Sequence, residues 1–284
     1  MCTGQCAART LTVLALAGVA FGATAIRKDM HFKVGKHPMV SISNQYGPIS
    51  VKAGAPRQVL VTVIIHSDKV EVDQSHSGSR VDLVSHLLAG SDETSGVVEY
   101  EIQVPPEANL TLHSGNGIIH AEKLHGDVSA EGANAAIEVV DCGDGHVSAR
   151  TLNGGVTITN VRNGHVEITS MGGDVIMNGV SGPFVQVESN SGKIQYDGDF
   201  GSGGEYSFTS HTGNIDAAAP AYASIDVLAR SNTGAVQSDF SLEPKHAPFL
   251  ARGANSFSGT LGKAASSVKL FSFSGKIHLK KRQN

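Results

Sequence analysis

Apolar and polar residues alternate in short segments along most of this chain, and the same pattern returns about every 19 residues. In each segment two apolar residues are separated by one polar residue. The first apolar column comprises Leu110, Val128, Val147, Val166, Val185, Tyr206 and Val227, and the second comprises Leu112, Ala130, Ala149, Ile168, Val187, Phe208 and Ala229. Alternation with a period of two is typical of a β-strand with one buried face. Each segment is therefore predicted to be a strand.

A short motif, Ser/Thr-x-x-Gly-x-(Ile/Val/Leu), follows most of these strands. It occurs at 114–119, 151–156, 170–175, 189–194, 210–215, 231–236, 256–261 and 272–277, with looser copies at 44–49 and 132–137. From Ile119 to Val236 the last residues of successive copies are 18, 19, 19, 19, 21 and 21 residues apart. A fixed period of this kind indicates one supersecondary unit that repeats.

Apolar residues resume two positions after the glycine column, at Ile119, Ile137, Val156, Val175, Ile194, Ile215 and Val236. Each repeat thus contains a strand, a glycine corner, a second strand and a second corner. Identical strands in successive repeats are expected to stack in parallel, about 4.8 Å apart. The predicted fold is all-β, a single-chain parallel β-helix (β-solenoid) with rungs of about 19 residues.

The motif glycines are predicted to be structural corners, because a tight corner often needs a positive φ angle that glycine adopts without strain. These corner glycines are Gly47, Gly117, Gly154, Gly173, Gly192, Gly213, Gly234, Gly259 and Gly275. The Ser/Thr hydroxyls three residues earlier are expected to bond a neighbouring hydroxyl or the corner backbone.

Residues 1–25 have the pattern of a signal peptide. Arg9 gives a positive start, 11–21 are apolar, and 23–25 read Ala-Thr-Ala, which suits a cleavage site. Cleavage after Ala25 would remove Cys2 and Cys6, and would export the chain to the periplasm, the cell surface or the medium. The alternative is an uncleaved membrane anchor, and a membrane is an expected partner only in that case.

The rest of the chain, 26–284, is predicted to be one solenoid domain. A first rung and an N-terminal cap of strands occupy 30–106, with a mobile loop at 89–95, and the repeat body occupies 107–284. The body is interrupted at 240–254, where Pro244, His246, Pro248, Phe249 and Arg252 fall outside the repeat. The function of this insertion is left open.

Composition and charge exclude some classes of function and partner. The formal net charge of −4 and the lack of a basic stripe with interleaved aromatic residues exclude a nucleic-acid partner. Cys142 is the one cysteine left after cleavage, and it shares a column with Leu124, Val161 and Val180. It is therefore predicted to be a small buried apolar residue and not a reactive thiol.

The repeat resembles a known family. The opening Val-x-Ile-x-Asn-x-x-Gly-x-Ile-x-Val at 40–51, the strand that ends at Val104-Pro105 and the tandem motif copies look like the bacterial putative-adhesin domain family, a domain family of unknown function. The resemblance spans about residues 30–280. It implies a secreted or surface-attached β-solenoid of the bacterial envelope, and it supplies no catalytic or binding residues.

One outward column offers a candidate metal site. It comprises Asp127, His146, His165, Phe184, Glu205 and Asp226. His146 and His165 should be neighbours on adjacent rungs, and two imidazoles at that separation can share Zn²⁺ or Cu²⁺, with Asp127 or Glu167 as a further ligand. The opposing interpretation is an exposed histidine ladder, because a straight column converges poorly on a tetrahedral centre. We expect no metal and no cofactor.

The outward columns contain mostly Ser, Thr, Asn and Gln, so converging carboxylates of a glycan-cleaving enzyme are not evident. The sequence therefore predicts a non-enzymatic binding, adhesion or scaffolding protein whose partner is a cell-surface glycan or an envelope protein. Two alternatives stay open: an envelope-assembly or regulatory partner that docks end-on, and a polysaccharide lyase or hydrolase of the β-helix type.

Overall fold

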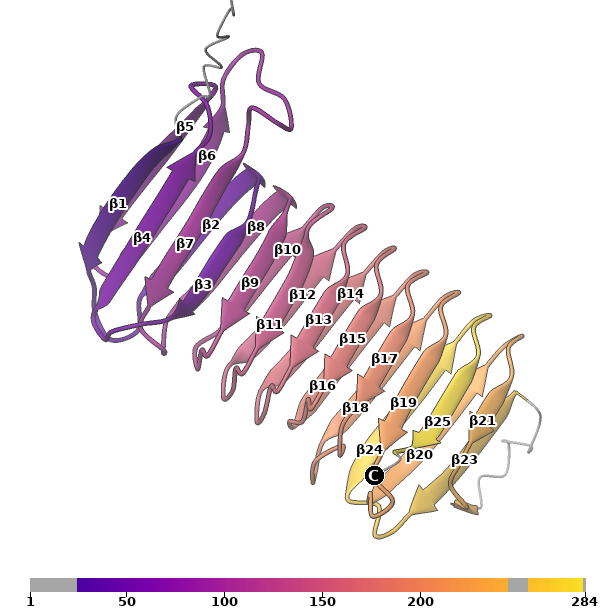
Figure 1. Ribbon diagram of the computed structural model, residues 1–284. Helices are drawn as coiled ribbons and strands as arrows, with labels where there is room; N and C mark the ends of the chain where they lie inside the picture. Colours follow the sequence, from indigo (N-terminus) through magenta and orange to yellow (C-terminus); the bar gives the residue numbers. More distant parts are fainter. Residues whose placement is uncertain (1–24, 245–254, 283–284) are drawn as a thin grey trace, which may run out of the picture.

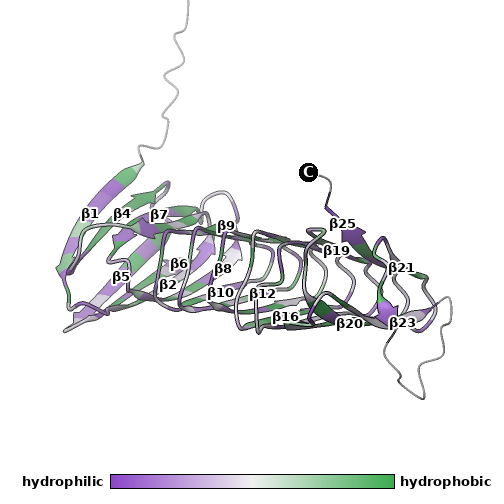
Figure 2. Ribbon diagram, turned by 90° about the horizontal axis from the view of Figure 1, so that it is seen from below, coloured by the Kyte–Doolittle hydropathy of each residue, from purple (hydrophilic) through white to green (hydrophobic). Residues whose placement is uncertain are grey.

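The computed structural model describes residues 25–244 and 255–282 and contains only strands, turns and loops there. Two sheets, of 12 and 13 strands, form the described part of the molecule (Figure 1). Figure 2 shows the two sheets lying one above the other along the whole length. We call the 12-stranded sheet, which contains β9 (Ile118–Glu122), sheet A, and the 13-stranded sheet, which contains β8 (Asn109–Asn116), sheet B. The predicted all-β solenoid is confirmed.

Each rung of the body contributes one strand to sheet B and the next strand to sheet A. After β8 and β9 come β10 (Val128–Gly132) and β11 (Ala136–Val140), β12 (His146–Thr151) and β13 (Val156–Thr159), β14 (His165–Ser170) and β15 (Val175–Asn178), β16 (Phe184–Ser189) and β17 (Ile194–Asp197), and β18 (Glu205–Ser210) and β19 (Ile215–Ala219). All these neighbours pair in parallel, with equivalent columns in register, such as Val128 with Val147 and Val147 with Val166. The predicted apolar columns are buried between the sheets.

The core widens around the corner at 197–204. Phe200 points inward from this corner and is fully buried, and its ring stacks on Tyr196 at a centroid distance of 4.6 Å. Tyr206 meets Phe200 edge-on at 5.0 Å, and the Tyr196 hydroxyl donates a hydrogen bond to Val180 O. The extra residues of this corner therefore supply a large side chain to the core.

The N-terminal end is built out of chain order. It comprises β1 (Ile26–Lys33), β2 (Met39–Tyr46), β3 (Ile49–Ala53), β4 (Gln58–Ile65), β5 (Val70–Ser77), β6 (Arg80–Leu87) and β7 (Val98–Val104). The predicted first rung, β2 with β3, has β8 and β9 on its inner side and β6 and β7 on its outer side, all parallel to it. Antiparallel β4 and β1 then extend sheet A, and antiparallel β5 extends sheet B.

The C-terminal end also departs from chain order. It comprises β20 (Ile225–Ser231), β21 (Val236–Ser238), β22 (Glu243–Pro244), β23 (Ser256–Leu261), β24 (Ser266–Ser272) and β25 (Ile277–Lys281). The last strands of the chain, β24 and β25, lie between the rung of β18 and β19 and the rung of β20 and β21. We call β24 with β25 the inserted rung; it is visible in yellow between orange strands in Figure 1.

One predicted repeat copy is wrong. Residues 256–261 fit the motif, but they form β23, which pairs antiparallel with β20 at the edge of sheet B. Gly259 therefore lies inside a strand opposite Val227, not at a corner between two strands. Its assignment as a corner glycine is corrected, because the motif is too short to fix strand direction.

The reason for the corner glycines also differs from the prediction. Gly47 and Gly117 have positive φ angles of 107° and 148°, but the later corner glycines of the body do not adopt positive φ. Instead a Cβ at Gly154, Gly173 or Gly192 would lie 1.8–1.9 Å from a carbonyl oxygen of the preceding rung. Close contact between backbones, not dihedral strain, excludes larger residues there.

Positive φ angles occur at the opposite corner, after the sheet A strands. Lys123, Asp141, Asn160 and Gly179 occupy equivalent positions and all have φ between 54° and 65°. Asn160 Nδ2 donates a hydrogen bond of 3.0 Å to Asp141 Oδ1 on the preceding rung. Asn and Asp tolerate this conformation better than most residues, which explains why this position does not need a glycine in every rung.

Two predicted segments lie outside the described residues: 1–24 of the signal peptide, and 245–254 of the insertion with His246, Pro248, Phe249 and Arg252. The first strand begins at Ile26, directly after the predicted cleavage position. In the residues that the structure describes, no helix has the length and apolar character needed to span a membrane.

Candidate functional site

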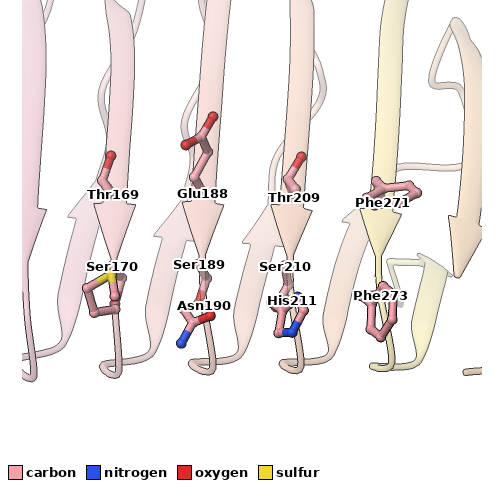
Figure 3. Close-up of a pocket in the computed structure, with 11 residues that line it drawn as sticks. Thr169, Ser170, Glu188, Ser189, Asn190, Thr209, Ser210, His211, Phe271 and Phe273 are labelled. Carbon is pink, nitrogen blue, oxygen red and sulfur yellow. The ribbon is translucent and has the colours of Figure 1, made fainter. Parts of the chain in front are cut away.

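A shallow groove of about 510 Å³ runs across four neighbouring strands on the outer face of sheet B. It lies where these strands turn toward sheet A (Figure 3). Its lining comes from the ends of β14, β16, β18 and β24: Thr169, Ser170, Met171, Glu188, Ser189, Asn190, Thr209, Ser210, His211, Phe271 and Phe273. We call it the rim groove.

Strand alternation arranges this lining into two outward rows with a buried row between them. Thr169, Glu188, Thr209 and Phe271 form the first row and pair in register across the four strands. Met171, Asn190, His211 and Phe273 form the second row, joined by backbone hydrogen bonds such as that from Phe273 N to Ser210 O. The same positions are thus presented four times, about 4.8 Å apart.

The floor of the groove is structural. Ser170 Oγ donates a hydrogen bond of 2.6 Å to Gly173 O, and Ser189 Oγ donates one of 2.8 Å to Gly192 O. Both serines are buried. This column was expected to bond a neighbouring hydroxyl or the corner backbone, and Ser170 and Ser189 do bond the corner backbone. The third floor serine, Ser210, is also buried, but its Oγ has no hydrogen-bond partner.

One end of the groove is aromatic and exposed. The Phe273 and His211 rings stack with centroids 5.0 Å apart and an interplanar angle of 13°. Phe271 and Phe273 are 39% and 46% exposed, and Met171 at the other end is 50% exposed. Large apolar side chains that gather on a surface commonly mark a binding site.

Polar groups occupy the middle of the groove. Glu188 accepts a hydrogen bond of 2.9 Å from Gln186 Nε2, which fixes the position of its carboxylate. Thr209 lies beside Glu188 on the neighbouring strand, and Asn190 lies in the second row at the end of the Glu188 strand (Figure 3). The groove therefore combines an aromatic platform with hydroxyl, amide and carboxylate groups, and Glu188 is the one carboxylate in its lining.

The repeat pattern did not predict this groove. Phe271 and Phe273 flank the buried Ser272 at outward positions. The column of Phe271 carries polar residues such as Glu131 and Glu188 on other rungs, and this was an available signal. Their contact with His211 was not predictable, because it depends on the inserted rung lying next to β18.

The histidine column is present, but its groups do not converge. His146 and His165 pair in register, with ring centroids 6.4 Å apart in an edge-to-face arrangement. His146 Nε2 lies 3.7 Å from Glu167 Oε2, whereas Asp127 accepts a hydrogen bond from the His146 backbone N–H. Within the described ranges, no group of three or more His, Cys, Asp or Glu side chains could hold a metal ion.

The far end of that column needs a correction. Glu205 pairs with Ser267, and Ser267 pairs with Asp226, so the inserted rung separates the two acidic residues that the sequence placed next to each other. The spacing of the repeats carries no information on this order.

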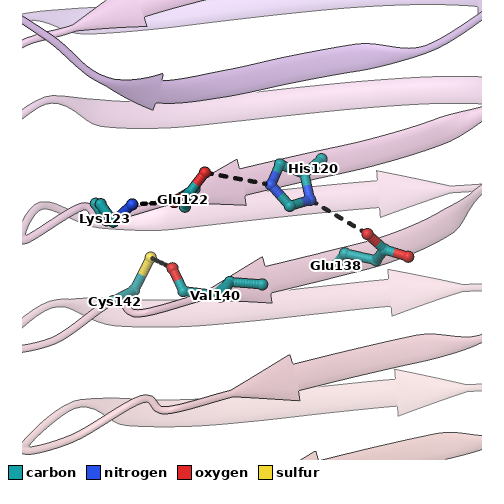
Figure 4. Close-up of polar contacts among 6 residues, drawn as sticks. All are labelled: His120, Glu122, Lys123, Glu138, Val140 and Cys142. Carbon is teal, nitrogen blue, oxygen red and sulfur yellow. Dashed lines mark hydrogen bonds and ion pairs between the residues drawn. The ribbon is translucent and has the colours of Figure 1, made fainter.

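A second polar cluster lies on the outer face of sheet A (Figure 4). His120 Nδ1 lies 3.2 Å from Glu138 Oε2 on the next rung, and its Nε2 lies 3.8 Å from Glu122 Oε2. Glu122 also pairs with Lys123, and this hydrogen bond lowers the pKa of the Glu122 carboxyl. The carboxylates thus contact basic side chains across and along the strands, as is common on an exposed sheet face.

Cys142 is buried among the column residues expected for it, and it forms no disulfide. Its Sγ lies 3.4 Å from Val140 O (Figure 4), and burial raises the pKa of the thiol. A neutral, shielded thiol is a poor nucleophile, so Cys142 acts as a core residue.

The chain is similar to several known proteins. Three crystal structures cover almost the whole chain: a putative cell adhesion protein from Clostridium sporogenes (13% identity, 90% of this chain and 100% of that chain, TM-score 0.24), a putative adhesin from Bacteroides fragilis (14%, 91% and 97%, 0.37) and a putative adhesin from Parabacteroides distasonis (12%, 92% and 98%, 0.35). A search of curated proteins found no match.

The family model described as Toastrack DUF4097 matches residues 40–280, which include every rung of the solenoid. This match spans far more than half of the chain and confirms the family resemblance seen in the repeat motif. The chain belongs to the Toastrack DUF4097 family.

Proposed function

We propose that this chain is an exported, non-enzymatic binding protein of the bacterial envelope, and that its rim groove holds one extended glycan chain. The observation that carries the proposal is the repetition of the same two outward positions on four strands, ended by the exposed stack of His211 and Phe273. Export is supported by the signal-peptide pattern of residues 1–25.

The repeated geometry favours a repeating ligand. The four strands place side chains at equivalent positions about 4.8 Å apart along a straight line. A polymer of similar units can meet each strand in a similar way, whereas a compact ligand would contact only one or two. The groove is also shallow and open at the surface, which suits a chain that lies along it.

The chemistry of the groove suits a sugar. A sugar ring has an apolar face of C–H groups and a rim of hydroxyls. The flat faces of Phe273 and His211 offer an apolar surface for the first. Glu188, Asn190 and Thr209 offer hydrogen-bond partners for the second.

The glycan-cleaving alternative has less support. Glycoside hydrolysis commonly uses two carboxyl groups on either side of the scissile bond, and the groove lining contains Glu188 alone. End-on assembly through the N-terminal end also has less support, because the outermost strands there carry charges: Arg27, Lys28 and Asp29 on β1, and Glu71 and Asp73 on β5. Charged side chains on an edge strand oppose the addition of another strand.

Binding of the full-length chain to a panel of immobilised bacterial glycans tests the proposal. For a glycan that the wild type retains, Phe273→Ala should weaken binding about tenfold, or ~1.4 kcal/mol, the scale of one aromatic contact. Leu152→Ala is the matched control, because Leu152 is 54% exposed at the equivalent position two rungs before Asn190 and does not line the groove. Equal losses in both variants, or retention of no glycan by the wild type, would contradict the proposal.

A further inference from the structure

We propose that the inserted rung is exchangeable between two copies of this chain, so that each copy places its β24 and β25 in the slot of the other. The slot lies between the rung of β18 and β19 and the rung of β20 and β21. The contacts on both of its walls, the loop that leads into it and the surface beside that loop each support exchange. The inference concerns self-association and is independent of whether the rim groove binds a glycan.

The inserted rung pairs in the same register with the rungs on both sides of the slot. Leu270 is level with Phe208 on one side and with Ala229 on the other, and Ser272 is level with Ser210 and Ser231. In sheet A, Ile277 is level with Ile215 and Val236. The slot can therefore accept a β24–β25 pair from either copy of the chain.

The inserted rung is held by contacts that do not depend on chain connection. Val268, Leu270, Ile277 and Leu279 are buried to within 1% exposure. On sheet A, Lys280 pairs with Asp216 at 3.1 Å, and Arg282 pairs with Asp197. A rung from a second copy would make every one of these contacts, so exchange preserves them, which is why domain swapping is a low-cost route to dimers.

The loop between β23 and β24 is short and strained. It consists of residues 262–265, all exposed, and two of them have positive φ angles: Gly262 at 65° and Ala264 at 53°. This conformation is unfavourable for a residue with a Cβ, such as Ala264. A short strained hinge favours exchange, because the loop can extend and release the strain when its rung enters another copy.

The surface beside this hinge suits a second copy. The loop passes close to Ala223 and Ser224, and Lys263 N donates a hydrogen bond of 2.9 Å to Ser224 Oγ. Tyr222, which precedes Ala223, is 81% exposed, the highest value among the large apolar side chains in the described parts of the chain. Two copies that exchange rungs must meet at their hinges, where each would cover the other's Tyr222.

Exchange would also link two rim grooves. Phe271 lies on β24 and Phe273 directly follows it, so each groove in an exchanged dimer would combine the Glu188 row of one copy with the aromatic end of the other. Two grooves held at a fixed separation would bind a polymeric ligand with avidity.

Disulfide trapping tests the exchange. The full-length chain, with Cys2, Cys6 and Cys142 replaced by Ala, receives the cysteine pair Ser207→Cys and Lys269→Cys, which are register partners on β18 and β24. The control pair is Gln186→Cys and Ser207→Cys on β16 and β18, two strands in chain order. Untagged and tagged forms are mixed in denaturant, refolded together under reducing conditions at several concentrations, and then oxidised.

We expect the first pair to give covalent dimers that contain both forms, in a fraction that rises with concentration, and the control pair to give cross-links within single chains only. Ala264→Gly should relieve the hinge and lower the dimer fraction at least about fivefold. Cross-links within single chains at every concentration for both pairs would overturn the proposal. So would failure of the first pair to cross-link while the control does, or a wild-type chain that sediments as a monomer at all concentrations.

Discussion

At the scale of single residues, the solenoid depends on glycines for a reason that the sequence alone did not reveal. The sequence predicted that the motif glycines are needed for positive φ, but at Gly154, Gly173 and Gly192 the physical cause is contact between rungs. A second glycine column, missed in the sequence, occupies the opposite corner, where a Cβ at Gly145 would lie 2.3 Å from Gly126 O. Contacts between rungs cannot be inferred from the spacing within one rung.

Two adjacent glycines make this claim testable. A Cβ at Gly154 would lie 1.9 Å from Ala135 O, whereas one at Gly155 would lie 3.6 Å from Asp174 O, an ordinary contact. Gly154→Ala should therefore lower the free energy of unfolding by about 1–3 kcal/mol, the usual cost of overpacking. Gly155→Ala should change it by no more than about 0.5 kcal/mol. Urea denaturation of both variants measures the difference, and equal effects would show that the rungs do not approach as described.

At the scale of elements, the sequence predicted the strands of the body and their parallel register, because each apolar column recurs in every rung. It did not predict the order of the last rungs. Val268 on β24 and Val227 on β20 fit the same column, so by pattern either strand could pair with β18. Only the connections and the side-chain contacts decide that β24 is the partner. The antiparallel direction of β23 was missed for the same reason.

Ion pairs help to fix the inserted rung. Asp216 on β19 contacts Lys193 Nζ at 2.9 Å and Lys280 Nζ at 3.1 Å. Burial alone would raise the pKa of this carboxyl, but the two lysine contacts outweigh burial and lower it below 3.8. A group whose pKa is lower in the folded state stabilises the fold above its unfolded pKa, and the contribution disappears as pH falls through the folded value.

Asp216→Asn should therefore unfold at a lower urea concentration than the wild type at pH 7, and the gap should close as the pH falls below about 4. Asp68→Asn is the control, because Asp68 is exposed and lies in a turn at the other end of the solenoid. Denaturation midpoints at pH 7 and pH 3 measure both effects. A gap that is as large at pH 3 as at pH 7 would show that the carboxylate charge of Asp216 does not hold the rung.

At the scale of the whole molecule, both ends of the solenoid and the rim groove depend on rungs that lie out of chain order. At each end one rung lies out of chain order, so its neighbours in the sheets are not its neighbours in sequence. At the C-terminal end this is the inserted rung, which also carries the aromatic part of the groove. The repeat alone specified the scaffold, whereas the candidate site arises where the repeat is rearranged.

The dependence of binding on ligand length tests the central claim most directly. Four strands about 4.8 Å apart give a groove roughly 15 Å long, so a ligand that lies along it must be several sugar units long to reach all four. Calorimetric titration of the full-length chain with oligosaccharides of one to six units, drawn from glycans retained on the panel, measures this. We predict affinity that rises with each unit until the groove is filled and then stays constant, and a rise that is lost in Phe273→Ala. A monosaccharide that binds as tightly as the longest oligosaccharide would contradict an extended site across the four strands.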